Sequence, residues 1–257
     1  MRRKAICMVV AIFILFLVHD AHAKRPLTVK VGEGDTVVSF IAGCAEVMPT
    51  GTTEWNSLGV NSVLVSGDQV RTQDKSRIEI TLPDQSVLRF AENTRFRVIK
   101  MDVSTEMKKR NVNVDVILGR TWANVSKTLG VTSSFELSSE NAVAGVRGTI
   151  YRMNVYEDKS ALVRVYDGEV AVSGGGEIKG TDPLSKMYTQ PHKIEGPKPV
   201  PGPRRVSMEE WTYIIRSMQQ IRIRADGVAE TPRSFSDAED KNDWVDWNRT
   251  RDNIVKR

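Results

Sequence analysis

The sequence predicts an all-β fold, a twisted solenoid-like or sandwich β domain of short strands, with a small C-terminal helical appendage. Short alternations of apolar and polar residues recur from about residue 29 to residue 173, with turn signals between them. No long helical period appears before position 200. A Pro-rich stretch and a segment with helical spacing then follow, so the β pattern ends well before the C-terminus.

Strand signals fill the first half of the β region. Gly67-Asp68 is a hairpin-type turn pair between two apolar runs. Residues 77–82 alternate strictly between polar and apolar, which is typical of a strand with one buried and one solvated face. The next residues, Pro83-Asp84, predict a turn, because Pro fixes the backbone angle φ at a value that turns require. Residues 87–90 and 95–101 then resume the strand pattern.

The second half continues in the same way. Residues 108–111 form a charged loop that is expected at a solvated hairpin tip, and the alternative is a functional basic patch. Apolar residues at every second position from Val112 to Leu118 mark one face of a strand, which Gly119 is expected to break. Further strands are expected at residues 121–125, 135–137, 149–155, 161–165 and 169–172.

The sequence predicts a signal peptide at residues 1–23, a β domain at 24–176, a Pro-rich linker at 177–206 and a C-terminal helical segment at 207–257. A basic start, a short apolar run and the small residues before position 24 predict a secretory signal peptide that is cleaved after Ala23. No membrane span is expected after cleavage, and the alternative is an uncleaved N-terminal anchor.

The C-terminal segment is expected to begin with a helix. Ser207 is a good N-cap, acidic residues follow in the first turn, and Gly227 is expected to end the helix. We expect its apolar stripe to dock on the β domain, the alternative being a partner protein. The tail from Glu230 is expected to form a short amphipathic turn or helix. The stripe consists of Trp211, Ile214, Ile215, Met218 and Ile221, and the tail residues with this spacing are Trp244, Trp247 and Ile254.

Composition excludes several functional classes. The net charge is +5 and falls to about +3 without the leader, and the basic residues alternate with acids, so no nucleic-acid partner is expected. His192 and Cys44 are then the only histidine and the only cysteine. Most metal sites need several such residues, and Ser-His-Asp chemistry would need His192, which lies in a turn-rich stretch and is expected to be an exposed loop histidine. We therefore expect no enzyme, no metal and no cofactor. Cys44 is expected to be a buried apolar residue, and an intermolecular disulfide is the alternative.

An ordered set of motifs occupies much of residues 45–173. The blocks in order are residues 67–72, 76–80, 82–90, 91–94, 119–123, 142–149 and 163–170. The most specific block contains Gly145-Val146-Arg147-Gly148, and a further block contains Trp122. Together these blocks resemble the FecR domain.

This resemblance implies a bacterial, β-rich domain that faces the periplasm. The best-known members relay a signal from an outer-membrane transporter to a sigma factor and carry a cytoplasmic anti-sigma segment before a transmembrane helix. Only residues 1–4 precede the apolar run here, so the expectation is a stand-alone domain without that segment. Such a protein is a non-enzymatic interaction or sensing module, and its partner is an envelope protein or a cell-wall glycan.

The residues singled out as structural or interaction sites are Gly145, Val146, Arg147, Gly148, Trp122 and Trp211. The two glycines suggest a tight corner of the chain. Arg147 is expected to pin this corner by bridging backbone carbonyls or a carboxylate such as Glu136 or Glu169, and the alternative is a ligand-binding cation.

Other classes of function remain as alternatives. Residues 28–37 are similar to the start of a LysM repeat, which supports peptidoglycan or polysaccharide binding. A hydrolase is the third class, and it would depend on His192 or on paired carboxylates.

Overall fold

The computed structural model of the chain describes residues 36–127, 133–174 and 211–255. The expected signal peptide at 1–23, the Pro-rich linker at 177–206, His192 and all but the last two residues of the LysM-like stretch at 28–37 lie outside the described residues.

Hydrogen bonds join sixteen strands into a continuous sheet that folds into two layers, here called sheet A and sheet B. Sheet A consists of β1 (Val37–Ala42), β5 (Arg77–Thr81), β6 (Val87–Phe90), the second half of β8 (Lys109–Asn124), β11 (Ile150–Val155), β12 (Ala161–Asp167), β15 (Gln219–Ile223) and β16 (Arg233–Ser234). Sheet B consists of β2 (Ala45–Met48), β3 (Asn56–Ser57), β4 (Gln69–Thr72), β7 (Arg95–Ser104), the first half of β8, β9 (Ser134–Ser138), β10 (Ala142–Val146), β13 (Glu169–Gly174) and β14 (Thr212–Arg216).

Strand β8 belongs to both sheets because it bends at Gly119. Its first half pairs with β7 and β9, and its second half pairs with β6 and β11. Gly119 has a φ of +111°, and a Cβ at this position would lie 2.3 Å from Thr94 Oγ1. Only glycine adopts this conformation without strain. The expectation that Gly119 ends the strand is therefore wrong, since the strand continues into the other layer.

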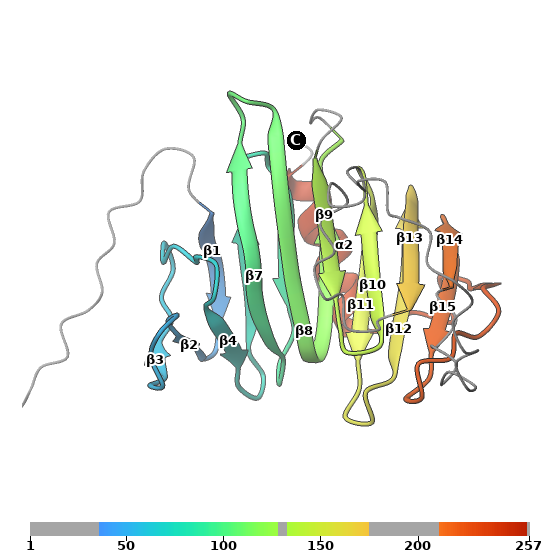
Figure 1. Cartoon of the computed structure of the whole chain (residues 1–257), viewed down its shortest axis with the longest axis horizontal. Helices are drawn as coiled ribbons and strands as arrows, with labels where there is room; N and C mark the ends of the chain where they lie inside the picture. The colour runs from blue at the N-terminus through green and yellow to red at the C-terminus, as the bar shows by residue number, and fades with distance from the viewer. Residues whose placement is uncertain (1–35, 128–132, 175–210, 256–257) are drawn as a thin grey trace, which may run out of the picture. The chain divides into compact units, whose positions relative to one another are not determined.

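The core lies between the two sheets. Alternate residues of each strand point inward, as the sequence pattern predicts, and they form one large apolar cluster. Phe90 of sheet A stacks on Phe96 of sheet B with ring centroids 3.7 Å apart, so the layers are in direct contact. Figure 1 shows strands of sheet B in front of the other layer. The expected fold class, mostly β with a small C-terminal helix, is confirmed.

The expected helix from Ser207 to Gly227 is wrong in its described part. Residues 212–223 form the hairpin of β14 and β15, in which β14 pairs with β13 and β15 pairs with β12. Ile215 and Ile221 are both buried in the core. The stripe that fits a helical period also fits two alternating strands, and the edges of both sheets supply partners for their backbone groups.

The tail contains the helix of the described chain, α2 (Asp243–Val255), as the sequence predicts for this region. Asn242 caps α2, because its Oδ1 accepts the backbone N–H of Val245 at 3.1 Å. Trp244 and Trp247 stack with centroids 5.4 Å apart. In Figure 1, α2 lies behind the strands of sheet B, and its side chains contact the outer face of sheet A.

Cys44 is exposed, so the expectation that it is buried is wrong. It follows Gly43, which lies in the turn between β1 and β2 and has a φ of +74°. The Cys44 N–H donates to Ser76 Oγ at 2.9 Å, so this position has a backbone role in the turn. Among the helices of the described residues, none has the length and apolar character that crossing a membrane requires.

Candidate functional site

A row of polar side chains crosses the outer face of sheet A. Its members are directly opposite one another from strand to strand, and each is less than a tenth exposed. Neighbouring residues in the same strands point into the core, so this row faces away from it. We call it the arginine row; it consists of Glu79, Arg89, Trp122, Arg152, Arg164 and Gln220.

Residues 235–255, here called the C-terminal clasp, cover the arginine row. At the β6 side, Asp252 of α2 accepts a charge-assisted hydrogen bond from Arg89 Nη1 at 2.6 Å. Its second oxygen accepts the indole N–H of Trp122 at 3.0 Å. Glu79 accepts from Arg89 Nε at 2.6 Å and from both ends of the Arg251 fork at 2.9 Å. The buried charges at this side are therefore all paired.

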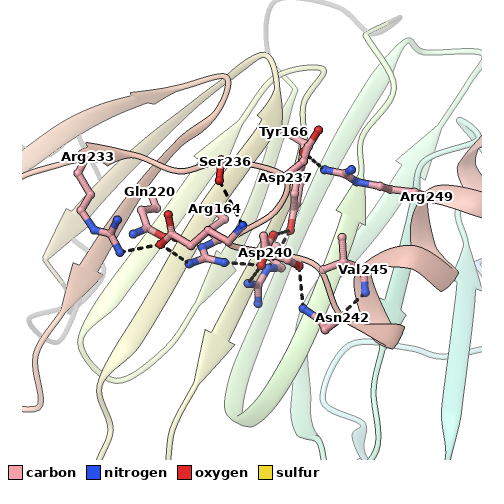
Figure 2. Close-up of polar contacts among 12 residues, drawn as sticks. Arg164, Tyr166, Gln220, Arg233, Ser236, Asp237, Asp240, Asn242, Val245 and Arg249 are labelled. Atoms are coloured by element: carbon pink, nitrogen blue, oxygen red, sulfur yellow. Dashed lines mark hydrogen bonds and ion pairs between the residues drawn. The ribbon is translucent and has the colours of Figure 1, made fainter.

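Asp240 makes the corresponding contacts at the β12 side. One of its oxygens accepts hydrogen bonds from both Arg152 and Arg164, and the other accepts the Tyr166 hydroxyl. Arg152 Nε also donates to the Tyr166 hydroxyl at 2.8 Å. Figure 2 shows Asp240 at the centre of these contacts, with Arg164 on one side and Tyr166 on the other. A single buried carboxylate thus bridges two neighbouring arginines, and Glu239 pairs with the second of them, Arg164, at 3.4 Å.

The environment of the row shifts two pKa values. Burial alone would raise the pKa of Glu79, but the hydrogen bonds from Arg251 and Arg89 outweigh it and lower the pKa to about 2. Burial raises the pKa of the Tyr166 phenol, and its contact with Asp240 adds to the rise against the opposing charge of Arg152. Glu79 is thus a carboxylate and Tyr166 a neutral hydrogen-bond donor at neutral pH. Neither is poised for acid–base catalysis.

The outer face of sheet B is polar as well, but its side chains are half-buried or exposed. Here Asn113 donates to Glu136 at 3.1 Å, and Ser138 donates to Asn113 at 3.4 Å. Burial raises the pKa of the neighbouring Asp115, against the opposing charge of Arg97 directly across the strand pair. We call this surface the polar face. It consists of Arg97, Asn113, Asp115, Glu136, Ser138, Val143, Gly145, Ala171 and Ser173.

The motif Gly145-Val146-Arg147-Gly148, here called the glycine motif, lies where the chain passes from the polar face to sheet A. Gly145 sits inside β10 with ordinary strand geometry, whereas Gly148 has a φ of +69° and forms the corner between β10 and β11. Val146 is buried in the core. Arg147 is exposed, and no described residue forms a hydrogen bond or ion pair with it. The expectation that Arg147 pins the corner through Glu136 or Glu169 is therefore wrong.

The two candidate tryptophans have different surroundings. Trp122 belongs to the arginine row and stacks on Tyr166 with centroids 4.5 Å apart. Trp211 precedes β14, packs against the core and donates its indole N–H to the Gly227 carbonyl at 3.2 Å. The structure thus brings Trp122 together with the clasp, while Trp211 and the glycine motif lie elsewhere.

No arrangement typical of catalysis occurs among the described residues. No group of three or more His, Cys, Asp or Glu side chains is placed to hold a metal ion in this part of the chain. A half-open groove of about 740 Å³ lies between residues 63–66 and the β7–β8 hairpin. Its lining mixes apolar and polar side chains, includes Met101 and Met107, and offers Asp102 as its one carboxylate. This groove lacks the paired carboxylates on which a hydrolase would depend.

The described residues thus form a two-layered β domain that carries polar side chains on the outer face of each sheet. Residues 68–171 match the family described as "FecR protein". The chain therefore carries a FecR domain, which spans β4 to β13 and includes Arg89, Trp122, Arg152 and Arg164 of the arginine row. The clasp lies outside the matched residues.

Two crystal structures of a "putative anti-sigma factor" from Parabacteroides distasonis ATCC 8503 are similar to this chain. They share 17% and 16% sequence identity with it, with TM-scores of 0.43 and 0.42. Each match covers 65% of this chain and 59% of the other protein, so the chain spans less than two thirds of that protein's length. No curated protein sequence is detectably similar to this chain.

Sequence reasoning missed the main members of the row and the clasp. Arg89, Arg152 and Arg164 each occupy a polar position in a strand, which by itself indicates a solvated side chain. Asp240 and Asp252 lie in a mixed-charge tail. Only the pairing of the strands places the three arginines in line, and only the fold brings the two acids to them.

Proposed function

We propose that this protein is a non-enzymatic interaction or sensing module of the bacterial envelope, and that it binds its partner through the polar face of sheet B. The observation that carries the proposal is the difference between the two outer faces. The clasp fills the outer face of sheet A, whereas the polar face carries half-buried and exposed groups that hydrogen bond mainly to one another.

The shape of the polar face suits a partner that approaches the backbone closely. A Cβ at Gly145 would make ordinary van der Waals contacts at 4.0 Å with the Ala171 carbonyl oxygen and with Glu136 Cγ, so the glycine leaves room for one more carbon above β10. Glycine within a strand often marks the place where a ligand or another backbone approaches. The surrounding Asn, Ser and carboxylate groups supply hydrogen bonds for such a partner.

The expected compartment is the periplasm or another exported location, as the N-terminal signal features suggest. N-terminal sequencing of the protein isolated from the envelope fraction tests this directly. A mature chain beginning at Lys24 supports export with cleavage. A chain that retains Met1 in the cytoplasmic fraction contradicts it.

Partner capture with two matched glycine variants tests the binding face. Gly145→Arg places a long side chain over the polar face without backbone strain, while Gly59→Arg makes the same change in an exposed loop whose Cβ has equal room. We expect the wild-type chain and Gly59→Arg to retain the same envelope protein after cross-linking, and Gly145→Arg to lose it. Equal capture by all three chains would exclude the polar face.

A cell-wall glycan is the second candidate partner, because the surface of β2 and β4 combines an aromatic ring with polar groups. The Arg71 guanidinium lies 4.2 Å from the centroid of the Trp55 ring, and Glu46 accepts from Arg71 at 2.7 Å and from Gln73 at 2.6 Å. Sedimentation with purified peptidoglycan tests this. We expect Trp55→Ala to abolish co-sedimentation if the glycan is the ligand, and an unchanged result would exclude this surface.

A further inference from the structure

We propose that the arginine row is a binding surface for an acidic helical segment of a partner protein, and that the C-terminal clasp is its exchangeable resident. This inference concerns the outer face of sheet A and does not depend on the polar face. The partner segment it implies carries two carboxylates spaced as Asp240 and Asp252 are, with an aromatic residue between them.

The clasp can leave without opening the core. The main apolar cluster fills the space between the two sheets and contains no residue from 235–255. Trp244 and Val245 belong to a separate, smaller cluster with Ala91 and Trp122 on the outer face. Strand pairing is also complete without the clasp, since β16 is the last strand before it. Segments with few core contacts open locally at lower free energy than the rest of a fold.

The face beneath the clasp requires an acidic occupant. Arg152 and Arg164 are directly opposite one another on adjacent strands, and like charges in this position repel. Arg89 lies in the same row, separated from Arg152 by Trp122. The clasp supplies the carboxylates of Asp240 and Asp252 at these points. An arginine fork binds planar carboxylates through paired hydrogen bonds, so any segment with the same two acids matches the row.

The helix of the clasp is too short to be stable by itself, which favours its exchange for a partner segment. α2 has 13 residues, and a helix of this length is marginal in water by itself. Its first turn carries Asp243 and Asp246, and its last turn carries no basic residue. Once released, the clasp therefore unfolds and leaves the row open. A tethered segment competes with a free partner through its high local concentration, so the clasp sets a threshold for partner binding.

Hydrogen exchange of the wild-type chain tests the release step. We expect the amides of α2 to exchange through a local opening, with a lower protection and a smaller denaturant dependence than those of β8, β11 and β12. Equal protection and equal denaturant dependence in all four elements would overturn the proposal, because the clasp would then open only with global unfolding.

Binding of a labelled peptide with the sequence of residues 235–255 tests the surface. We expect the full-length Asp240→Asn/Asp252→Asn chain to bind this peptide at least about tenfold more tightly than the wild-type chain does, because its own clasp competes less. The peptide with both aspartates changed to asparagine is expected not to bind. Asp158→Asn/Asp226→Asn, which alters two aspartates outside the clasp, is expected to behave as the wild type.

Two outcomes would overturn the assignment. Equal affinity of the two double variants for the peptide would exclude an acid-specific row. A wild-type dimer that dissociates on adding the peptide would assign the occupant to a second copy of this chain instead of a partner protein. If the clasp variant fails to fold, the exchange measurement on the wild-type chain still decides whether the clasp opens by itself.

Discussion

At the level of single residues, the main feature of the candidate site is a set of buried charged side chains that pair with one another. Arg89 is fully buried and is held by Glu79 and Asp252 at 2.6 Å each. Removing one member of such a set leaves an uncompensated charge, which costs far more than the pair itself contributes. The alternation of the sequence indicates that these positions face away from the core, yet it cannot show that a distant segment will bury them.

Glu79 makes the stability of the protein depend on pH. Its pKa falls from 4.5 to about 2 in the folded chain, so its contribution is complete above pH 4.5 and is lost as the pH falls towards 2. Glu79→Gln is expected to lower the free energy of unfolding by about 3 kcal/mol at pH 7, because Arg89 and Arg251 lose their shared carboxylate. The difference from the wild type should shrink between pH 5 and pH 3 in urea unfolding experiments.

Glu46→Gln is the matched control for this prediction. Glu46 pairs with Arg71 at 2.7 Å, but both side chains are about 30% exposed. Such pairs contribute at most about 1 kcal/mol to the free energy of unfolding, so Glu46→Gln should lower it by no more than this. A Glu79→Gln chain whose difference from the wild type is the same at pH 7 and pH 3 would contradict the role assigned to Glu79.

At the level of elements, two segments depart from what their sequences indicate. Gly119 carries β8 from one sheet to the other instead of ending it, because β7 and β9 on one side and β6 and β11 on the other continue the ladder. Residues 212–223 form a hairpin because β12 and β13 offer them free edges. In both cases the strands that pair with the segment are remote in sequence, and this pairing outweighs the local preference for a strand end or for a helix.

The two glycines inside strands should differ sharply in their tolerance of alanine. At Gly119 a Cβ would lie 2.3 Å from Thr94 Oγ1 and 2.6 Å from Thr94 Cα, and φ is positive. Gly119→Ala is therefore expected to cost about 2–3 kcal/mol of stability in chemical denaturation. Gly145 has ordinary strand geometry, and its Cβ would meet no atom nearer than 4.0 Å, so Gly145→Ala should stabilise the chain by up to about 1 kcal/mol. Equal losses at both positions would contradict the bend assigned to β8.

At the level of the whole molecule, the two sheets form one core, and the stacked rings of Phe90 and Phe96 join them. Phe96→Ala is expected to lower the free energy of unfolding by about 3–5 kcal/mol, and Phe96→Leu by less than about 1.5 kcal/mol. The test is denaturant unfolding followed by tryptophan fluorescence and by far-UV circular dichroism, whose transitions should coincide in a single cooperative step.

Ile99 provides the control on the same strand. It is 45% exposed, so Ile99→Ala should change stability by no more than about 0.5 kcal/mol. Amides of β11 and β12 in sheet A that exchange in a different denaturant transition from those of β10 and β13 in sheet B would show that the sheets unfold independently, against the single core described here.

Local patterns in the sequence were enough to predict the β class, most of the strands from Arg77 to Gly174, the FecR resemblance and the short helix of the tail. Period-two alternation and turn residues are local signals, and each strand needs only one buried face to display them. The tertiary structure alone decided the alignment of Arg89, Arg152 and Arg164, their closure by Asp240 and Asp252, and the exposure of Arg147 and Cys44. These features depend on which strands pair and on what covers them, and such long-range contacts leave no periodic trace in the chain.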